Sequence, residues 1–139
     1  MEDVDEIDAK LLSMLAEDSR QSYTDLAKTL NLSDVAVKKR IDKLMEKKII
    51  TNFSITVDQA KLGKALHSFL LLRTNPTETD SILAELRKIP DIGRISSALG
   101  PFDIVIEIHT SKISDLKRLT EEDIGNLKGV IEVRTLIMT

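Results

Sequence analysis

The chain has 139 residues, of which 42% are hydrophobic and 31% are charged, and its formal net charge is −3 with a pI near 5.4. The absence of cysteine excludes a disulfide framework and a thiolate metal site. No apolar run approaches the ~18 residues of a membrane span, and the acidic start does not resemble a secretory leader. We therefore expect one or two small domains that act in the cytoplasm without a membrane partner.

The charge is unevenly distributed along the chain. Six cations and two anions lie between Lys38 and Lys48, whereas five anions and no cation lie between Glu2 and Asp8. The acidic pI argues against a nucleic-acid partner, but binding DNA requires a local positive surface more than a positive whole. The basic stretch keeps DNA binding open.

The first fifty residues predict three helices. Apolar residues recur at helical spacing from Val4 to Leu15, and this first helix is expected to end near 18–20. Ser22 and Ser33 are residue types that favour helix N-caps, so we expect a second and a third helix to follow them. Because only a tight turn separates these two helices, the pattern predicts a helix-turn-helix.

Beyond Lys48 the periodicity changes from helix to strand. Phe53, Ile55 and Val57 alternate with polar residues, which predicts a strand, and Gly63 lies in a connector. We therefore predict a helix-turn-helix domain at 1–50, a strand and hinge at 51–63, and a second domain at 64–139.

The second domain has the predicted order strand, helix, strand, strand, helix, strand. The strands are expected at 66–73, 92–99, 102–109 and 130–138; the helices are expected after Asn75, with Pro76 at the first position, and at 114–126. Two βαβ halves of this kind fold as a four-stranded antiparallel sheet with two helices on one face. The fold class is therefore α+β, with a three-helix domain followed by a ferredoxin-like βαββαβ domain.

One face of this sheet is expected to lack a cover within the chain. Ile104, Ile106 and Ile108 face one way, while Val105 and its alternate neighbours face the other. On the last strand, Val130, Leu136 and Met138 are expected to share the face opposite Val133. A sheet that is apolar on both faces needs a second cover, and a homodimer is the simplest source.

The third helix has the residues that a major-groove reader needs. Its N-terminal residues would lie at base edges and its cations at phosphates, with Ala36 suited to a thymine methyl group. The alternative is a solvated charged helix in an ordinary three-helix bundle. The candidate DNA-binding residues are Arg20, Ser22, Ser33, Asp34, Ala36, Val37, Lys38, Lys39, Arg40 and Lys43. Arg40 has two possible roles: a phosphate contact, or an ion pair with Asp8 that ties the third helix to the first.

The N-terminal half carries a characteristic set of positions: Asp8, Asp18-Ser19-Arg20, Leu26-Ala27, Leu32-Ser33, Val37, Arg40-Ile41, Leu44 and Ile49-Ile50. In these residues it resembles the DNA-binding half of the leucine-responsive regulator/AsnC family. Three positions depart from the pattern: Met45 replaces a glutamate, Lys48 a glycine, and Ser33-Asp34 a Ser-Pro opening. An acid at position 34 repels phosphate but can accept from cytosine N4, so it affects sequence preference rather than binding mode.

The C-terminal half also resembles this family, through Gly100, Asp103 and the closing stretch KGVIEVRTLIM. The resemblance implies that the chain is a prokaryotic regulator of transcription that binds double-stranded DNA. It also implies that the chain forms homodimers, that these assemble to tetramers or octamers, and that it responds to an amino acid. The implied effector-binding residues are Leu99, Gly100, Pro101, Phe102, Asp103 and Thr135. Backbone N–H groups of the turn would hold the effector carboxylate and Asp103 its ammonium group, although an ordinary hairpin turn also favours Gly and Asp.

The sequence contains no pattern that predicts catalysis, a metal cage or a cofactor. His67 and His109 are the only histidines, and a lone histidine on a strand is more often structural. We therefore expect no enzyme activity, no metal and no cofactor. Two alternatives stay open: a subunit resembling siroheme decarboxylase, which shares the two-domain architecture, and a sensing or assembly module that no longer binds DNA.

Overall fold

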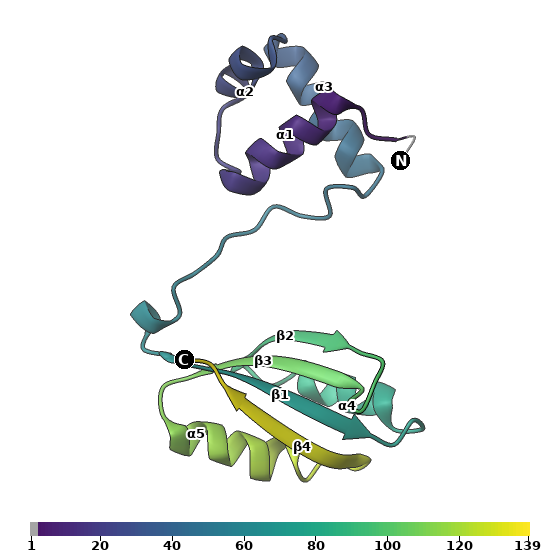
Figure 1. Cartoon of the computed structure of the whole chain (residues 1–139), viewed down its shortest axis with the longest axis vertical. Helices are drawn as coiled ribbons and strands as arrows, with labels where there is room; N and C mark the ends of the chain where they lie inside the picture. Colours follow the sequence, from purple (N-terminus) through teal and green to yellow (C-terminus); the bar gives the residue numbers. More distant parts are fainter. Residues whose placement is uncertain (1–2) are drawn as a thin grey trace. The chain divides into compact units, whose positions relative to one another are not determined.

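The computed structural model describes residues 3–139, so Met1 and Glu2 of the predicted first domain lie outside the described residues. The chain forms two compact units, of which the first ends at Thr56 and the second spans Val57–Thr139. Figure 1 shows that the first unit is built of helices and the second of a sheet with helices.

The first unit contains α1 (Glu6–Glu17), α2 (Tyr23–Leu30) and α3 (Asp34–Glu46). Each helix begins at a side-chain cap: Asp5, Ser22 and Ser33 accept from the backbone N–H three residues later. At α1 the bond is reciprocal, because the Asp8 carboxylate also accepts from the Asp5 N–H. Asn31 ends α2 in the left-handed conformation at φ 55°, which turns the chain sharply toward α3.

The core of the first unit consists of one apolar stripe from each helix. The buried residues are Leu11, Leu15, Leu26, Ala27, Val37, Ile41 and Leu44. The predicted helix-turn-helix is confirmed, and the position of α3 is fixed by burial of one face against α1 and α2.

The second unit is a four-stranded antiparallel sheet in the order β2-β3-β1-β4 (Figure 1). The strands are β1 (Leu66–Thr74), β2 (Ile92–Ser97), β3 (Ile104–Thr110) and β4 (Val130–Ile137). Both helices, α4 (Thr79–Leu86) and α5 (Ile113–Arg118), pack against the same face of this sheet. The core residues of this unit are Leu70, Leu72, Ile82, Leu86, Ile104, Ile106, Ile108, Leu116, Leu119 and Ile124. The predicted α+β, ferredoxin-like class is confirmed.

Three predicted elements differ from the structure. The strand predicted from Phe53 is wrong for this chain: within residues 3–139 the segment 51–57 pairs with no strand, because a strand needs a partner for its backbone groups. The helix predicted after Asn75 begins only at Thr79, since the Asn75 carboxamide accepts from the Thr77 N–H and forms a turn instead. The helix predicted at 114–126 changes at Leu119 to a wider π-helical segment, Leu119–Ile124.

The prediction for Val130 is also wrong. Val130 and Val133 both pack against the helix-covered core, although residues three apart on a regular strand face opposite ways. A register shift between Arg73 and Thr74 places Thr74 opposite Val130, and this irregularity turns Val130 inward. Gly129 precedes it at φ 95°, with the Glu78 Cβ where a side chain would lie, so only glycine fits there.

Within the described residues of the second unit, the sheet face away from α4 and α5 has no cover. Phe69 and Leu71 on β1 lie beside Val105 on β3 and Leu136 on β4, and Leu136 is 51% exposed. This apolar surface, made by those four residues, is called the open face below. In residues 3–139, none of the helices has the length and apolar character that crossing a bilayer would require.

Candidate nucleic-acid interface and effector site

The start of α3 is tied to α2 by polar contacts. The Ser33 hydroxyl caps α3 by accepting from the Ala36 N–H at 3.1 Å. The Thr24 hydroxyl donates to the Asp34 carboxylate at 2.8 Å and so joins the two helices across the turn. Asp34 is therefore hydrogen-bonded within the unit, and this contact helps to hold the start of α3 against α2.

Burial separates the predicted DNA-binding residues of α3 into two groups. Val37 is fully buried in the three-helix core, so the prediction that it contacts DNA is wrong; its β-branched side chain is a core residue. Lys38, Lys39 and Lys43 are exposed, and Ala36 is half-buried. Lys38 pairs with Asp42 at 2.7 Å, and this hydrogen bond raises the pKa of Lys38. Among residues 3–139, Lys39 and Lys43 form no ion pair, which leaves both free for phosphate.

Arg40 makes the ion pair that was one of its two predicted roles. Its Nη1 lies 2.8 Å from a carboxylate oxygen of Asp5 and 2.8 Å from one of Asp8. The hydrogen bonds to Asp5 and then Asp8 raise the pKa of Arg40. The pKa of Asp5 is lowered, first by the Asp8 backbone N–H and then by Arg40. Arg40 thus ties α3 to the start of α1, and its guanidinium is engaged inside the unit.

The remaining predicted positions of the first unit are spread over its surface. Ser22 caps α2, and Arg20 is exposed between α1 and α2, where its backbone N–H donates to Asp18. Val35, which was not among the predicted contacts, is 64% exposed in the first turn of α3. The exposure of Val35 could have been predicted from the sequence. Residues two apart on a helix are rotated by about 200° around its axis, so Val35 lies on nearly the opposite side of α3 from the buried Val37.

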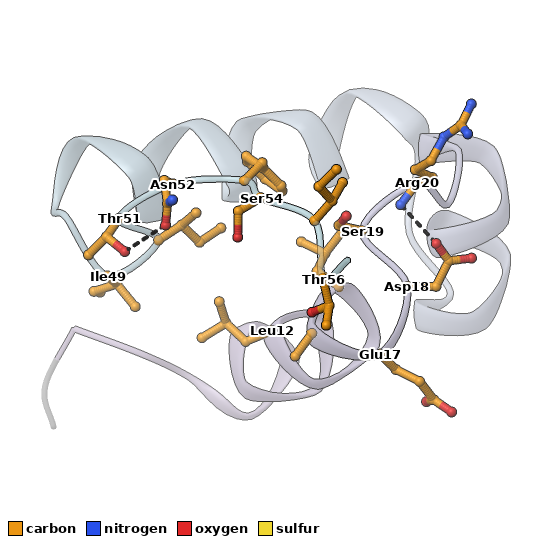
Figure 2. Close-up of a pocket in the computed structure, with 15 residues that line it drawn as sticks. Leu12, Glu17, Asp18, Ser19, Arg20, Ile49, Thr51, Asn52, Ser54 and Thr56 are labelled. Atoms are coloured by element: carbon orange, nitrogen blue, oxygen red, sulfur yellow. Dashed lines mark hydrogen bonds between the residues drawn. The ribbon is translucent and has the colours of Figure 1, made fainter. Parts of the chain in front are cut away.

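A hollow of about 620 Å³ lies in the first unit between α1 and the segment 49–56. Figure 2 shows Leu12 of α1 on one side and Ser54 on the other, with Arg20 directed away from the space. The apolar residues of the extended segment are only weakly buried at the hollow: Phe53 is 47% exposed and Ile55 is 83% exposed. We assign it no ligand.

In the second unit, the predicted effector turn lies between β2 and β3. Asp103 closes it: its N–H donates to the Leu72 carbonyl, and its own carbonyl accepts from the Ala98 N–H. One carboxylate oxygen of Asp103 also accepts from the Thr74 N–H at 2.6 Å and from the Thr74 hydroxyl at 3.1 Å. Neutral donors on β1 therefore satisfy one oxygen of this carboxylate without a cation.

The tip of the turn is open. The Leu99 side chain is fully exposed, and nothing lies within 4 Å of the place where a Cβ of Gly100 would be. Within residues 3–139, the N–H groups of Leu99, Gly100 and Phe102 have no protein acceptor. Pro101 is exposed and Phe102 half-buried. The turn thus offers a cluster of unused donors beside an exposed apolar side chain.

Thr135 lies in a different environment from the turn. It lies on β4, opposite Leu70 of β1, and lines a hollow of about 230 Å³ together with Ile113, Lys117 and Glu121. None of the residues 99–103 lines that hollow. Within one chain, the structure therefore brings Asp103 to Thr74 and does not bring Thr135 to the turn.

A helix-turn-helix unit followed by a βαββαβ unit defines a two-part regulator, with one unit for DNA and one for a ligand. Residues 4–45 match the model of the AsnC-type helix-turn-helix domain, and residues 67–139 match the model of the Lrp/AsnC ligand binding domain. The chain belongs to the Lrp/AsnC family of helix-turn-helix transcription regulators.

Similar proteins agree with this assignment. The HTH-type transcriptional regulator LysM of Sulfurisphaera tokodaii is 33% identical over 139 residues, covering 99% of this chain and 96% of its own length. AsnC of E. coli has a similar fold, with a TM-score of 0.87 at 24% identity over 97% of this chain and 91% of its own. The structure of the transcriptional regulator NMB0573 from Neisseria meningitidis, a complex with L-Met, gives a TM-score of 0.92 at 17% identity, covering 98% and 90%. LysM of Saccharolobus solfataricus, 29% identical over 136 residues, is likewise named an HTH-type transcriptional regulator.

Proposed function

We propose that the chain is a sequence-specific regulator of transcription that binds DNA by placing α3 in the major groove. It would act in the cytoplasm. The observation that supports DNA binding most directly is the outward surface of α3. It presents an apolar side chain, Val35, in the first turn and, behind it, two cations that form no ion pair within residues 3–139, Lys39 and Lys43. Val35 is suited to a thymine methyl group and the lysines to phosphates. Residues 1–50 would form the DNA-binding domain, 51–63 the linker, and 64–139 the domain for effector and assembly.

The regulator would act as a homodimer that presents two α3 helices to a pseudo-palindromic site. Two features support a dimer. The open face is apolar and has no cover within the second unit, and the extended segment 51–57 has backbone groups without a strand partner among residues 3–139. A second copy would cover the open face. Further assembly to tetramers or octamers is part of the same proposal.

The effector would be an amino acid bound at residues 99–103. The unused N–H groups of Leu99, Gly100 and Phe102 are suited to a carboxylate, and the second oxygen of Asp103 to an ammonium group. The L-Met complex of NMB0573 shows that a protein of this fold takes an amino acid. Thr135, which lies on β4 away from the turn, would contribute only if assembly brought a second chain to it. Binding would favour one assembly over another, because a ligand shifts only the states that it binds differently.

DNA binding is tested with Lys39→Ala and Lys43→Ala on a fragment that includes the region upstream of the protein's own gene. Each lysine that contacts phosphate should reduce the slope of log affinity against log salt by about one unit per cation per subunit. Binding is measured by fluorescence anisotropy at several salt concentrations. Lys117→Ala, which removes an exposed lysine from the second unit, is the matched control and should leave the slope unchanged.

An unchanged affinity and salt slope in the Lys39→Ala, Lys43→Ala double variant would show that α3 does not contact DNA. A wild type that binds no fragment would favour the alternative of a sensing module without DNA binding. Val35→Ala adds a second test, because it should weaken binding to the preferred sequence and leave the salt slope intact.

A further inference from the structure

Two histidines and one glutamate meet at one end of the sheet. His67 on β1 and His109 on β3 stand directly opposite each other, and Glu107 lies two residues before His109 on the same side of β3. All three extend from the side of the sheet that α4 and α5 leave uncovered, and all three are half-buried.

The strand register explains why the two imidazoles are close. The His67 carbonyl accepts from Met138 on one side, and the His109 N–H donates to the Asp91 carbonyl on the other. The two residues are therefore a non-hydrogen-bonded antiparallel pair, the kind in which the side chains lie nearest to each other. The rings stack with centroids 4.4 Å apart and planes 6° from parallel.

The ligand atoms of the three side chains converge. His67 Nε2 lies 2.8 Å from Glu107 Oε1, and one ligand atom of each of the three residues lies within 4.8 Å of the others. Two ligands that each lie about 2.0–2.1 Å from a tetrahedral zinc are about 3.3 Å apart. A metal ion binds an imidazole nitrogen close to the plane of the ring, so the two stacked rings would have to rotate out of their parallel arrangement to direct both nitrogens at one ion.

We propose that His67, Glu107 and His109 bind a divalent transition metal ion, with zinc as the best fit. Two neutral imidazoles and one carboxylate form a ligand set that zinc takes, and water would complete a four-coordinate site. Calcium and magnesium are disfavoured because they prefer six or more oxygen ligands. Lys64, three residues before His67, pairs with Asp91 at 2.8 Å, so its charge is already compensated. The site does not depend on the proposed DNA or amino-acid binding.

The experiment uses the full chain without a purification tag, freed of metal by chelation, with Zn²⁺ followed by calorimetry and Co²⁺ by visible absorption. We expect one ion per chain. His67→Gln and His109→Gln should each weaken Zn²⁺ binding at least about tenfold, and Glu107→Gln should weaken it by a similar factor. Glu132→Gln is the matched control: this carboxylate lies on the same sheet, pairs with Arg73 and Arg134, and should leave metal affinity unchanged.

The Co²⁺ spectrum tests the proposal on the wild type alone, so it does not depend on how well any variant folds. A wild type that binds Zn²⁺ no more tightly than about 1 mM, or that gives no visible band with Co²⁺, would overturn the proposal. Equal Zn²⁺ affinity of the wild type and the His67→Gln, His109→Gln double variant would also overturn it.

Discussion

The Asp103 carboxylate allows a structural role and an effector role to be separated by substitution. Its Oδ2 accepts two hydrogen bonds from Thr74, and Thr74 is only 4% exposed. The Thr74 hydroxyl also contacts Thr79 Oγ1 at 3.0 Å, so it keeps a partner when the carboxylate is removed. The buried Thr74 N–H then loses the acceptor that the Asp103 carboxylate provides.

Asp103→Ala should destabilise the second unit by about 2–3 kcal/mol, because an unsatisfied buried donor costs ~1–3 kcal/mol and the lost bonds are charge-assisted. For a unit of this size, that corresponds to a fall in Tm of roughly 10–20 °C. Asp103→Asn keeps an acceptor oxygen of the same shape, so it should cost less than about 1 kcal/mol. Thermal and urea unfolding of the full chain measure both values, with Thr74→Val as a control that keeps the N–H and removes only the hydroxyl.

The same asparagine variant tests the effector role. If Asp103 holds an ammonium group, Asp103→Asn should weaken amino-acid binding by roughly ten- to a hundredfold while the fold stays intact. Equal destabilisation by Ala and Asn would refute the argument that the acceptor atom matters most. If no amino acid binds the wild type in calorimetry, or if Asp103→Asn dissociates the oligomer without ligand, Asp103 is an assembly residue and the sensing role belongs elsewhere.

Two further predictions concern assembly and acid stability. Leu71→Asp on the open face, opposite Arg134, should convert the dimer to a folded monomer at micromolar protein concentration, as measured by analytical ultracentrifugation. The control Ile113→Asp changes a residue on α5 that is 66% exposed and should leave the dimer intact. A monomeric wild type would contradict the dimer proposal. The Asp8 N–H and Arg40 lower the pKa of Asp5, and Lys47 lowers that of Asp3, so both carboxylates stabilise the first unit above their unfolded pKa near 4 and lose this effect as pH falls through their folded pKa values. The free energy of unfolding of the first unit should therefore differ less between pH 7 and pH 3 in Asp5→Asn than in the wild type. An equal difference in the two proteins would contradict the role of this carboxylate.

The sequence by itself determined the three helices of the first unit and the strand and helix order of the second. Helical spacing of apolar residues and the caps at Ser22 and Ser33 act within a few residues of each other, so they are visible in a linear sequence. The same holds for the alternation on β3, where Ile104, Ile106 and Ile108 are all buried. The family motifs lie in these elements, which is why the linear sequence is enough to predict the class of regulator.

The tertiary structure alone decided which side chains meet. Val37 has the position of a DNA contact in the linear pattern, but the packing of three helices buries it. Asp103 is isolated in the sequence, but β1 supplies Thr74, which is 29 residues away. The inward turn of Val130 depends on a register shift against β1, and the pairing of His67 with His109 depends on which residues of β1 and β3 stand opposite each other. Local sequence encodes backbone preference over a few residues, whereas strand register and helix packing are set by the balance of burial over the whole unit.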